Sequence, residues 1–479
     1  YTPSSTLQRM ELLKTGYMGT LSLGWDNYLF LELTGRQERS STLKDQSFFY
    51  PSANLSFLFT QAFHMPSWWN YGKLRLSYGI VGNAPETYTA NIVYEQGSDN
   101  GFTWNTIPSS WGNADIRPEK KYEYEIGLES KFLNNRLGID VSYYNNRVKD
   151  QILSTPQPST SGVKNVLMNV GEVANHGWDI SISATPILTR DFRWDLTANY
   201  GVYKNKVVKL ADGVPYLEIL NSGGSGIKIQ AVEGQPMGDI YAQVPQVNEN
   251  GEYLVSDKGL YLNQTELQKV GNINPAGVGG LFNSFSYKNV FLDFSIDFRI
   301  GGDVINEMNQ YATAVGLTPE SLKYRDTEHG GLSYYYPGDN NSSGIPVQVD
   351  PSTGAGPNGE IIYHDGIILP GVVASTGERN TRIIPAGYYY NTTYNWGTEA
   401  EQLTYRHSVF DNSYVKLREL TIGYQFPEKM ISKLGLGRLS VSVFGRNLFY
   451  FYKALKNYDA ESSVGTSWAN QATVGSSTT

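Results

Sequence analysis

Side chains capable of catalysis are sparse in this chain. Histidine, the commonest general base, occurs only five times, at His64, His176, His329, His364 and His407, and cysteine is absent. Hydrolases need a base held beside a nucleophile or a metal. None of the usual short signatures, such as His-Glu-x-x-His, Gly-x-Ser-x-Gly or a phosphate-binding glycine loop, occurs in the sequence. The sequence therefore predicts no catalytic residues, and we expect the chain not to be an enzyme.

Two acidic segments resemble calcium-binding loops at first sight. They are Asp339–Ser343 and Asp350–Glu360, and both are rich in Asp, Asn, Gly or Ser. Neither has the ligand spacing of an EF-hand. These residue types also favour turns whether or not a metal is bound. We therefore expect no metal site and no cofactor.

Aromatic side chains in long polar segments are better candidates for contact with a ligand. An aromatic face with a polar handle suits a half-hydrated surface, where it can stack on a sugar ring or a peptide side chain. Protein interfaces select the same residue types, so packing within the loops or against a partner protein is the alternative interpretation. The candidate substrate-binding residues are Trp104, Trp111, Tyr334, Tyr335, Tyr389 and Trp396.

Segments of alternating polarity separate these loops. In Leu292–Ile300, every second side chain is apolar and the intervening ones are charged or hydroxylic. Successive side chains of a strand point to opposite faces, so this pattern predicts a strand with one apolar and one polar face. Six hairpins of this kind are expected: Tyr17–Trp25 with Tyr28–Thr34, Ser52–Thr60 with Lys73–Gly79, Tyr122–Lys131 with Arg136–Tyr144, Trp178–Ala184 with Phe192–Tyr200, Leu281–Tyr287 with Val290–Ile300, and Ser413–Tyr424 with Arg438–Tyr450.

Short turns and long polar connections succeed each other along the chain. Turn residues such as Asp26-Asn27, Asn134-Asn135 and Lys288-Asn289 close three of the hairpins. The long connections cover 35–51, 81–121, 145–177, 201–280 and 301–412. A soluble β-sandwich also alternates apolar and polar residues. The succession of short and long connections is instead typical of a transmembrane β-barrel with short periplasmic turns and long outer loops.

Two irregularities are expected in the sixth hairpin. The alternation changes phase near Glu419, which indicates a β-bulge. The connection Pro427–Leu434 is expected to hold one helical turn, because proline suits a first helical position.

Composition agrees with an all-β membrane wall. The 479 residues include 35 Tyr, 9 Trp and 19 Phe, yet hydrophobic residues reach only 40% and the mean hydropathy is -0.37. Half of each barrel strand faces a polar interior, which explains aromatic richness without general hydrophobicity. A net charge of -8 argues against a nucleic-acid partner. Tyr1–Lys14 lacks the apolar segment of a signal peptide, so we expect these not to be the first residues synthesised.

Four sequence segments, in order along the chain, resemble motifs of one family. They lie in Asn169–Asp179, Glu233–Tyr241, Gly271–Asp303 and Ser413–Phe449. Together they resemble the SusC/RagA family of TonB-linked outer-membrane transporters of Bacteroidota, from the first hairpin to about Tyr458. The family's plug, TonB box, early strands and last aromatic-ending strand have no counterpart in residues 1–479. The resemblance therefore implies that this chain supplies about 12 strands of a barrel of about 22.

The resemblance also implies a function. It indicates a protein of the bacterial outer membrane, embedded in the lipid bilayer, that imports an oligosaccharide or a peptide with energy from TonB. A SusD-like surface lipoprotein would cover the barrel, and TonB would contact the N-terminal region that is not matched here. Two alternatives stay open: an outer-membrane enzyme of the phospholipase kind, and an adhesin or structural barrel.

Overall fold

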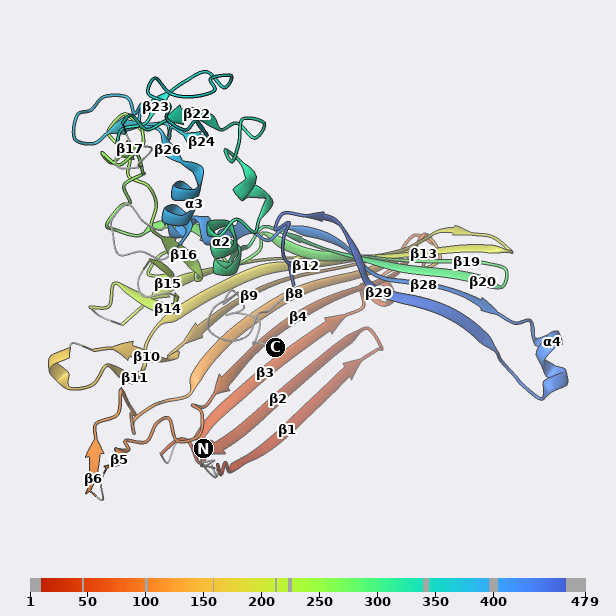
Figure 1. Ribbon diagram of the computed structural model, residues 1–479. Coiled ribbons are helices and arrows are strands. Elements are labelled where there is room, and N and C mark those ends of the chain that lie inside the picture. Colours follow the sequence, from red (N-terminus) through yellow and green to blue (C-terminus); the bar gives the residue numbers. More distant parts are fainter. Residues whose placement is uncertain are drawn as a thin grey trace.

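One antiparallel sheet of twelve strands dominates the computed structural model (Figure 1). The structure describes residues 10–44, 47–99, 102–157, 159–211, 213–222, 226–338, 344–395 and 404–461. In the sheet each strand pairs with the next one along the chain. The strands are β1 (Lys14–Trp25), β2 (Leu29–Ser40), β3 (Ser47–Phe57), β4 (Trp69–Asn83), β8 (Glu119–Phe132), β9 (Leu137–Lys149), β12 (Glu172–Leu188), β13 (Phe192–Lys209), β19 (Gly277–Tyr287), β20 (Val290–Ile300), β28 (Tyr414–Gln425) and β29 (Ser440–Lys453).

These twelve strands are those that the alternation predicts, and the six hairpins are confirmed. Most strands extend further toward the long loops than predicted, because pairing continues past the last clear alternation. One prediction is wrong at its end: β3 stops at Phe57, and the next residues form the short helix α1 (Phe59–Ala62). Among the described residues, no helix is long and apolar enough to cross a membrane.

The predicted turn residues have the backbone conformation that tight hairpins require. Asp26 and Asn27 adopt φ angles of 45° and 58°, and Asn134 and Asn135 adopt 57° and 62°. Lys288 has a φ of 53°. Asn and Asp tolerate this left-handed region better than other residues with a side chain. The local sequence thus explains why these hairpins reverse where they do.

The irregularities of the last hairpin are also confirmed. Ser295 of β20 pairs with Glu419, whereas the next residue, Ile296, pairs with Leu417, so Arg418 is the additional residue of a bulge. The turn after β28 holds α4 (Glu428–Ile431) and a 3-10 turn, η5 (Ser432–Leu434). Pro427 is the N-cap of α4 rather than its first residue.

Paired positions across the sheet share a face, so the ladder register assigns an apolar and a polar side. One row of paired residues crosses all twelve strands, and every member is apolar or aromatic except a glycine: Trp25, Leu29, Phe57, Leu74, Leu128, Val141, Ile180, Tyr200, Gly279, Phe298, Val415 and Tyr452. The neighbouring row, on the other face, is polar from β4 to β28 except for one glycine: Lys73, Glu129, Asp140, Ser181, Asn199, Gly280, Asp297 and Lys416. We refer to these sides as the lipid face and the lumen face.

The long polar connections contain sheets and helices of their own. The two longest form what we term the loop body, which comprises the described residues of 210–276 and 301–412. It contains β14 (Tyr216–Ser222), β15 (Ile227–Val232), β16 (Asp239–Ala242), β17 (Leu254–Val255), β18 (Gln268–Asn272), β21 (Asp303–Ile305), α2 (Glu307–Ala314), η3 (Pro319–Leu322), β22 (Leu332–Tyr335), β23 (Val347–Gln348), β24 (Tyr363–Ile367), β25 (Val372–Val373), β26 (Ile384–Pro385), α3 (Ala386–Tyr394), η4 (Tyr405–Ser408) and β27 (Val409–Asp411). Figure 1 shows these elements gathered above one end of the sheet, whereas the hairpin turns and α4 lie at the other end.

The shorter loops after β4 and β9 hold small pairings. These are formed by β5 (Glu95–Asp99), β6 (Phe102–Thr106), β7 (Ser110–Trp111), β10 (Ile152–Pro156), η1 (Ser159–Ser161) and β11 (Asn165–Asn169).

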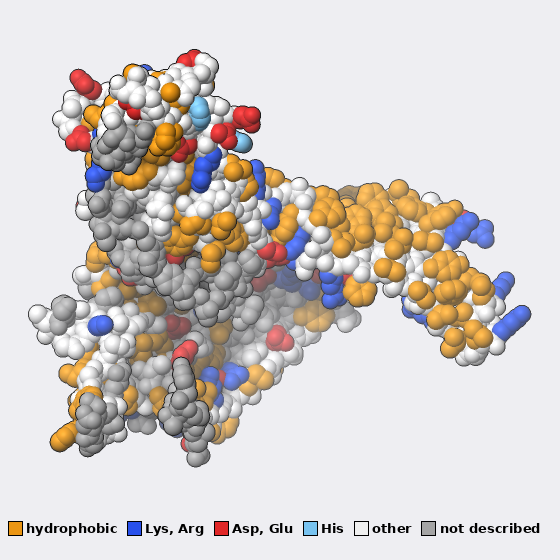
Figure 2. Space-filling model, in the orientation of Figure 1, with side chains coloured by type: hydrophobic (Ala, Val, Ile, Leu, Met, Phe, Trp, Pro, Cys, Tyr) orange, Lys and Arg blue, Asp and Glu red, His pale blue; other side chains and the backbone are white. Residues whose placement is uncertain are grey.

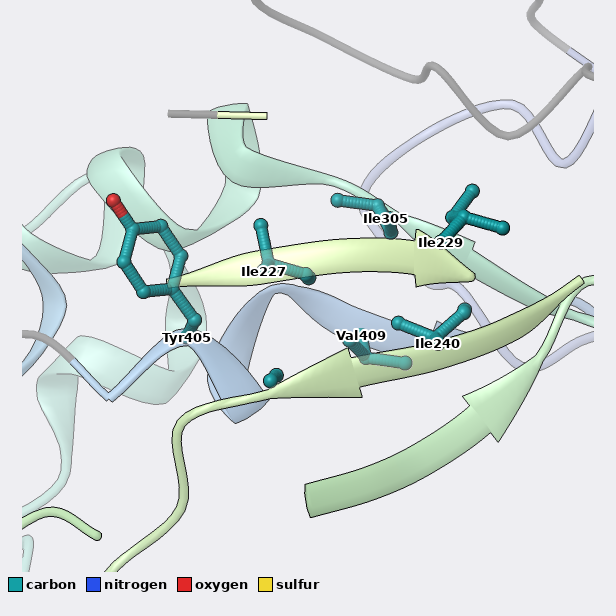
Figure 3. Packing of buried hydrophobic residues seen from close by; sticks show 7 residues of the cluster. Ile227, Ile229, Ile240, Ile305, Tyr405 and Val409 are labelled. Carbon is teal, nitrogen blue, oxygen red and sulfur yellow. The ribbon is translucent and has the colours of Figure 1, made fainter. Parts of the chain in front are cut away.

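A buried apolar cluster stabilises the base of the loop body. Ile227, Ile229 and Ile240 of the β15–β16 pair point toward Ile305 and Val409 of the β21–β27 pair (Figure 3). All five are nearly inaccessible to solvent. Segments separated by more than 60 residues in sequence thus share one core, which makes the loop body a folded unit rather than a set of flexible loops.

Candidate functional site

The lumen face carries a network of charged side chains. Both terminal nitrogens of Arg75 donate to the Asp140 carboxylate, at 3.1 and 2.6 Å, and one also donates to Ser142 at 3.1 Å. Glu129 lies 3.5 Å from the same guanidinium. These residues come from β4, β8 and β9, whose alternation directs them to one side. A shallow hollow of about 740 Å³ lies over this network and extends past Asp179 to Asp297.

A second charged cluster is built around the bulge in β28. Because Arg418 is the additional residue of the bulge, its side chain reaches the lumen face and donates to Asp297 at 2.5 Å and to Asn447 at 2.8 Å. Glu461 accepts from Arg418 and from Lys416, whose side chain is only 4% exposed. The hydrogen bond from Arg418 is the main reason that the pKa of Glu461 falls to about 2. The segment after β29 is thereby tied to the inner wall.

The loop body contains a tyrosine-lined pocket of about 530 Å³, which we term the tyrosine pocket. Its aromatic walls come from α3, from the segment after α2 and from the segment after β17; its polar edge is formed by Glu320 and Lys323. The tyrosines are Tyr261, Tyr324, Tyr389, Tyr390 and Tyr394. The rings of Tyr389 and Tyr390 have centroids 5.1 Å apart, and Tyr394 lies 6.2 Å from Tyr389.

Hydrogen bonds within the protein hold two of these rings in place. The Tyr390 hydroxyl donates to the carbonyl oxygens of Glu320 and Lys323, at 2.8 and 3.3 Å. Tyr261 donates to the Pro370 carbonyl at 3.2 Å. Burial raises the pKa of Tyr390 to about 12, so its phenol stays protonated and acts as a donor. With the hydroxyls bound to the backbone, the ring faces are the groups that a ligand could contact.

His407 supports the tyrosine pocket from outside. Its ring stacks on Tyr394 with centroids 4.4 Å apart. Burial, and secondarily the positive charge of Arg406, lowers the pKa of His407 to about 4. The imidazole is therefore neutral at physiological pH and acts as a flat packing surface.

The six predicted substrate-binding residues do not come together. Tyr389 lines the tyrosine pocket. Tyr334 is 1% exposed, because its ring packs between Tyr336 and Ile383 and its hydroxyl donates to Asp365. Its neighbour Tyr335 pairs with Val347 at the edge of the same small sheet. Tyr334 therefore supports the loop body and presents no ring face to solvent.

The remaining candidates lie in other loops. Trp104 is 48% exposed on the β5–β6 hairpin, and the half-buried Trp111 contacts the edge of Tyr94 with centroids 6.1 Å apart. Trp396 lies outside the described residues. Substrate binding by these residues stays a prediction. Sequence reasoning missed Tyr261 and Tyr324 of the tyrosine pocket, because each is a single tyrosine far in sequence from the Tyr388–Tyr390 run.

Groups suited to catalysis or metal binding are poorly placed in the described part of the chain. Ser333 Oγ and His364 Nδ1 are 2.8 Å apart, but Ser333 is 2% exposed, so a substrate could not reach it. No group of three or more His, Asp or Glu residues is arranged to hold a metal in the parts that the structure describes. The Asp350 and Glu360 carboxylates accept hydrogen bonds within their own loop, and Asp339–Ser343 lies outside the described residues.

Comparison with known proteins gives consistent matches. Residues 5–240 match the family model described as TonB dependent receptor-like, beta-barrel. The TonB-dependent receptor P3 of Formosa agariphila is 24% identical over 494 residues, which cover 94% of this chain and 42% of that protein. The TonB-dependent receptor SusC of Bacteroides thetaiotaomicron is 30% identical over 247 residues, which cover 47% of this chain and 24% of SusC.

A solved structure supports the same fold. The RagAB peptide transporter superposes with a TM-score of 0.67 at 19% identity, over 94% of this chain and 45% of that chain. The chain spans less than half the length of these relatives. They are named receptors and transporters rather than enzymes.

Proposed function

We propose that this chain, a TonB-dependent receptor-like β-barrel of the outer membrane that is similar to SusC and RagAB, forms the wall and outer chamber of a nutrient importer. The importer would work with a SusD-like lipoprotein. The observation that carries the proposal is the two-sided wall. One face carries an apolar row across all twelve strands, interrupted only by Gly279, and the other carries the Arg75 and Arg418 networks. Such a wall separates acyl chains from an aqueous interior.

The complete barrel is proposed to contain about 22 strands, as in outer-membrane transporters with a plugged lumen. Within the described residues, β1 and β29 are the two edges of the sheet. An unpaired edge is costly in lipid, because its backbone groups have no water to bond. Further strands of the protein would pair with these two edges. TonB would act on a plug domain formed by other parts of the protein.

The substrate is proposed to be an oligosaccharide or a peptide that contacts the loop body. The tyrosine pocket supports this proposal, since its ring faces suit both sugar rings and peptide side chains. The loop body stands at the loop end of the wall (Figure 1), where a ligand from outside would arrive first. Trp104 and Trp111 lie in the loop after β4 and are proposed as additional contacts.

Deletion of the gene tests the importer function. We expect growth on one oligosaccharide or one peptide source to be lost, and an affinity-tagged form of the protein to co-purify with a surface lipoprotein. Unchanged growth on all oligosaccharide and peptide sources would reject import and favour the adhesin or structural alternative. Hydrolysis of phospholipid micelles by the purified protein would favour the enzyme alternative.

Replacing one tyrosine of the tyrosine pocket tests whether the ligand binds there. Tyr389→Ala removes a ring whose stacking contributes about 0.5–1.5 kcal/mol, so we expect the imported ligand to bind about two- to tenfold more weakly, measured by calorimetry with the purified protein. Tyr388→Ala is the matched control, because Tyr388 is on the same helix but does not line this pocket. Equal affinities for the two variants would exclude the tyrosine pocket as the binding site.

A further inference from the structure

The lipid face changes from apolar to cationic side chains near the loop ends of five neighbouring strands. In the last fully apolar row, β4, β8, β9, β12 and β13 contribute Leu76, Ile126, Tyr143, Trp178 and Val202. The rings of Tyr143 and Trp178 lie 4.9 Å apart between centroids. Tyrosine and tryptophan are typical of the level at which a barrel leaves the hydrocarbon.

The next three rows on the same face are rich in lysine and arginine. Toward the loops the paired residues are Tyr78, Tyr124, Asn145, His176 and Lys204; then Ile80, Tyr122, Arg147, Ala174 and Lys206; then Gly82, Lys120, Lys149, Glu172 and Lys209. The six cationic side chains are all exposed. Glu172 is the only carboxylate in these rows, and it lies 3.0 Å from Arg147. We term these six side chains the basic rim: Lys120, Arg147, Lys149, Lys204, Lys206 and Lys209.

On the lipid face, the last two rows at the turn ends of β8, β9, β12 and β13 carry no charged residue. Toward the turns, the paired rows on the lipid face of β8, β9, β12 and β13 are Ser130, Ile139, Ile182 and Ala198, and then Phe132, Leu137, Ala184 and Leu196. A general need for solubility at the ends of strands would place charges at both ends. The cations of the basic rim therefore lie only on the loop side of these strands, at the level of the outer leaflet.

The basic rim also borders a concave surface. A hollow of about 510 Å³ opens beside Lys149, Glu172 and Lys209; Asp150, which is paired with Arg117 at 3.3 Å, also lines it. The Lys149 ammonium lies over the Tyr122 ring, 5.8 Å from its centroid, which holds it close to the wall. An ammonium group held against an aromatic ring at the polar boundary matches the way lysine behaves at a membrane surface.

We propose that the basic rim binds the phosphate groups of a phosphorylated lipid in the outer leaflet of the outer membrane. This inference rests on the outer-membrane location and on the outward direction of the loops. Charge complementarity identifies the occupant, since six cations face one carboxylate at the depth of the headgroups. The acidic surface of a partner protein is a less suitable occupant, because the rim is directly continuous with the lipid-covered row of Tyr143 and Trp178.

A lipid-binding titration tests the proposal on the complete outer-membrane protein, purified in mild detergent. Bisphosphorylated lipid A is the probe, and its dephosphorylated form tests the need for phosphate. The variant Lys149→Ala/Lys204→Ala/Lys206→Ala removes three cations. Each is expected to contribute about fivefold in affinity, so the variant should bind lipid A about a hundredfold more weakly. Lys121→Ala is the matched control, because Lys121 is adjacent to Lys120 but points to the other face, where it pairs with Glu123 at 2.7 Å.

Several outcomes would overturn the proposal. Equal binding of lipid A by the triple variant and the unaltered protein would do so, as would equal binding of the dephosphorylated lipid. Displacement of lipid A by millimolar inorganic phosphate would indicate a site for the free ion. Loss of the co-purifying lipoprotein with lipid A binding intact would identify the rim as a protein interface. The triple variant should still import, so a failure of lipid binding is distinguishable from a failure of the importer function.

Discussion

Tyrosine illustrates how position decides the role of a residue in this protein. Tyr334 is a core residue of the loop body, with its hydroxyl satisfied by Asp365. Tyr389 has the same side chain but lines an open pocket. Tyr122 lies on the lipid face under an ammonium group. The same amphipathic ring serves packing, ligand contact and the membrane boundary, depending on what surrounds its hydroxyl and its face.

His407 makes the loop body sensitive to acid. In the unfolded chain its pKa is 6.5, but burial lowers it to about 4 in the folded protein. As the pH falls below 6.5, the unfolded state takes up a proton that the folded state does not, so the stability of the loop body decreases. Between pH 6.5 and 5 we expect faster limited proteolysis of the loop body.

The variant His407→Phe keeps a flat ring against Tyr394 but cannot titrate. We expect its proteolysis rate to be nearly constant between pH 6.5 and 5, a range that lies above the titration of ordinary carboxylates. If this variant became sensitive to the same extent as the unaltered protein, another group would be responsible.

At the scale of the strand, the alternation of residues and the bulge in β28 determine which side chains face the lumen. Regular alternation places Asp140 and Ser181 beside each other on the polar side. The bulge in β28 then inserts Arg418, which brings two successive side chains, Arg418 and Glu419, to the polar side. Arg418 can consequently bond both Asp297 and Glu461. A bulge here is a means of adding a charge to the inner wall.

Two adjacent residues of β12 test the assignment of faces. Ile180 belongs to the apolar row, whereas Ser181 pairs with Asp140 and Asn199 on the lumen face. We expect Ile180→Arg to lower the free energy of unfolding by about 1–3 kcal/mol, because arginine costs about 2–4 kcal/mol at the bilayer midplane and less toward the interface, and Ile180 lies one row from Trp178. Ser181→Arg should have a small effect. Urea unfolding in lipid vesicles measures both, and similar losses would mean that the two faces are assigned wrongly.

The whole molecule consists of a regular wall and a folded loop body, which are joined at the base of the loop body. The β21–β27 pair marks this base, since Ile305 pairs directly with Val409 although 103 residues separate them. In Figure 2, hydrophobic side chains cover much of the arm that ends at α4, whereas the loop body at the opposite end shows mixed charged and polar side chains. The two parts thus face different surroundings.

This base permits a defined excision. Replacing residues 306–408 with Asn-Gly joins Ile305 to Val409, which are already paired. We expect the protein to insert into the outer membrane, because β20 and β28 pair independently of this segment. Import should fall to background, since the tyrosine pocket is removed. Heat-modifiable electrophoretic mobility and uptake measure the two properties.

Excision of residues 95–106, the β5–β6 hairpin, serves as the control for loss of an outer loop. It removes Trp104 but leaves the loop body intact. We expect this variant to retain more import than the larger excision. Normal import after the larger excision would show that residues 306–408 of the loop body do not take part in uptake.

The sequence by itself determined the strands, the turns at Asp26-Asn27 and Asn134-Asn135, and a bulge near Glu419. These features depend on the alternation and turn chemistry of neighbouring residues, which can be read locally. Only the tertiary structure decided that Tyr261 and Tyr389 line one pocket, that Tyr334 is buried, and that the cations of three strands form the basic rim. Such groupings depend on register between strands and on long-range packing of loops, for which the local sequence has no periodic signal.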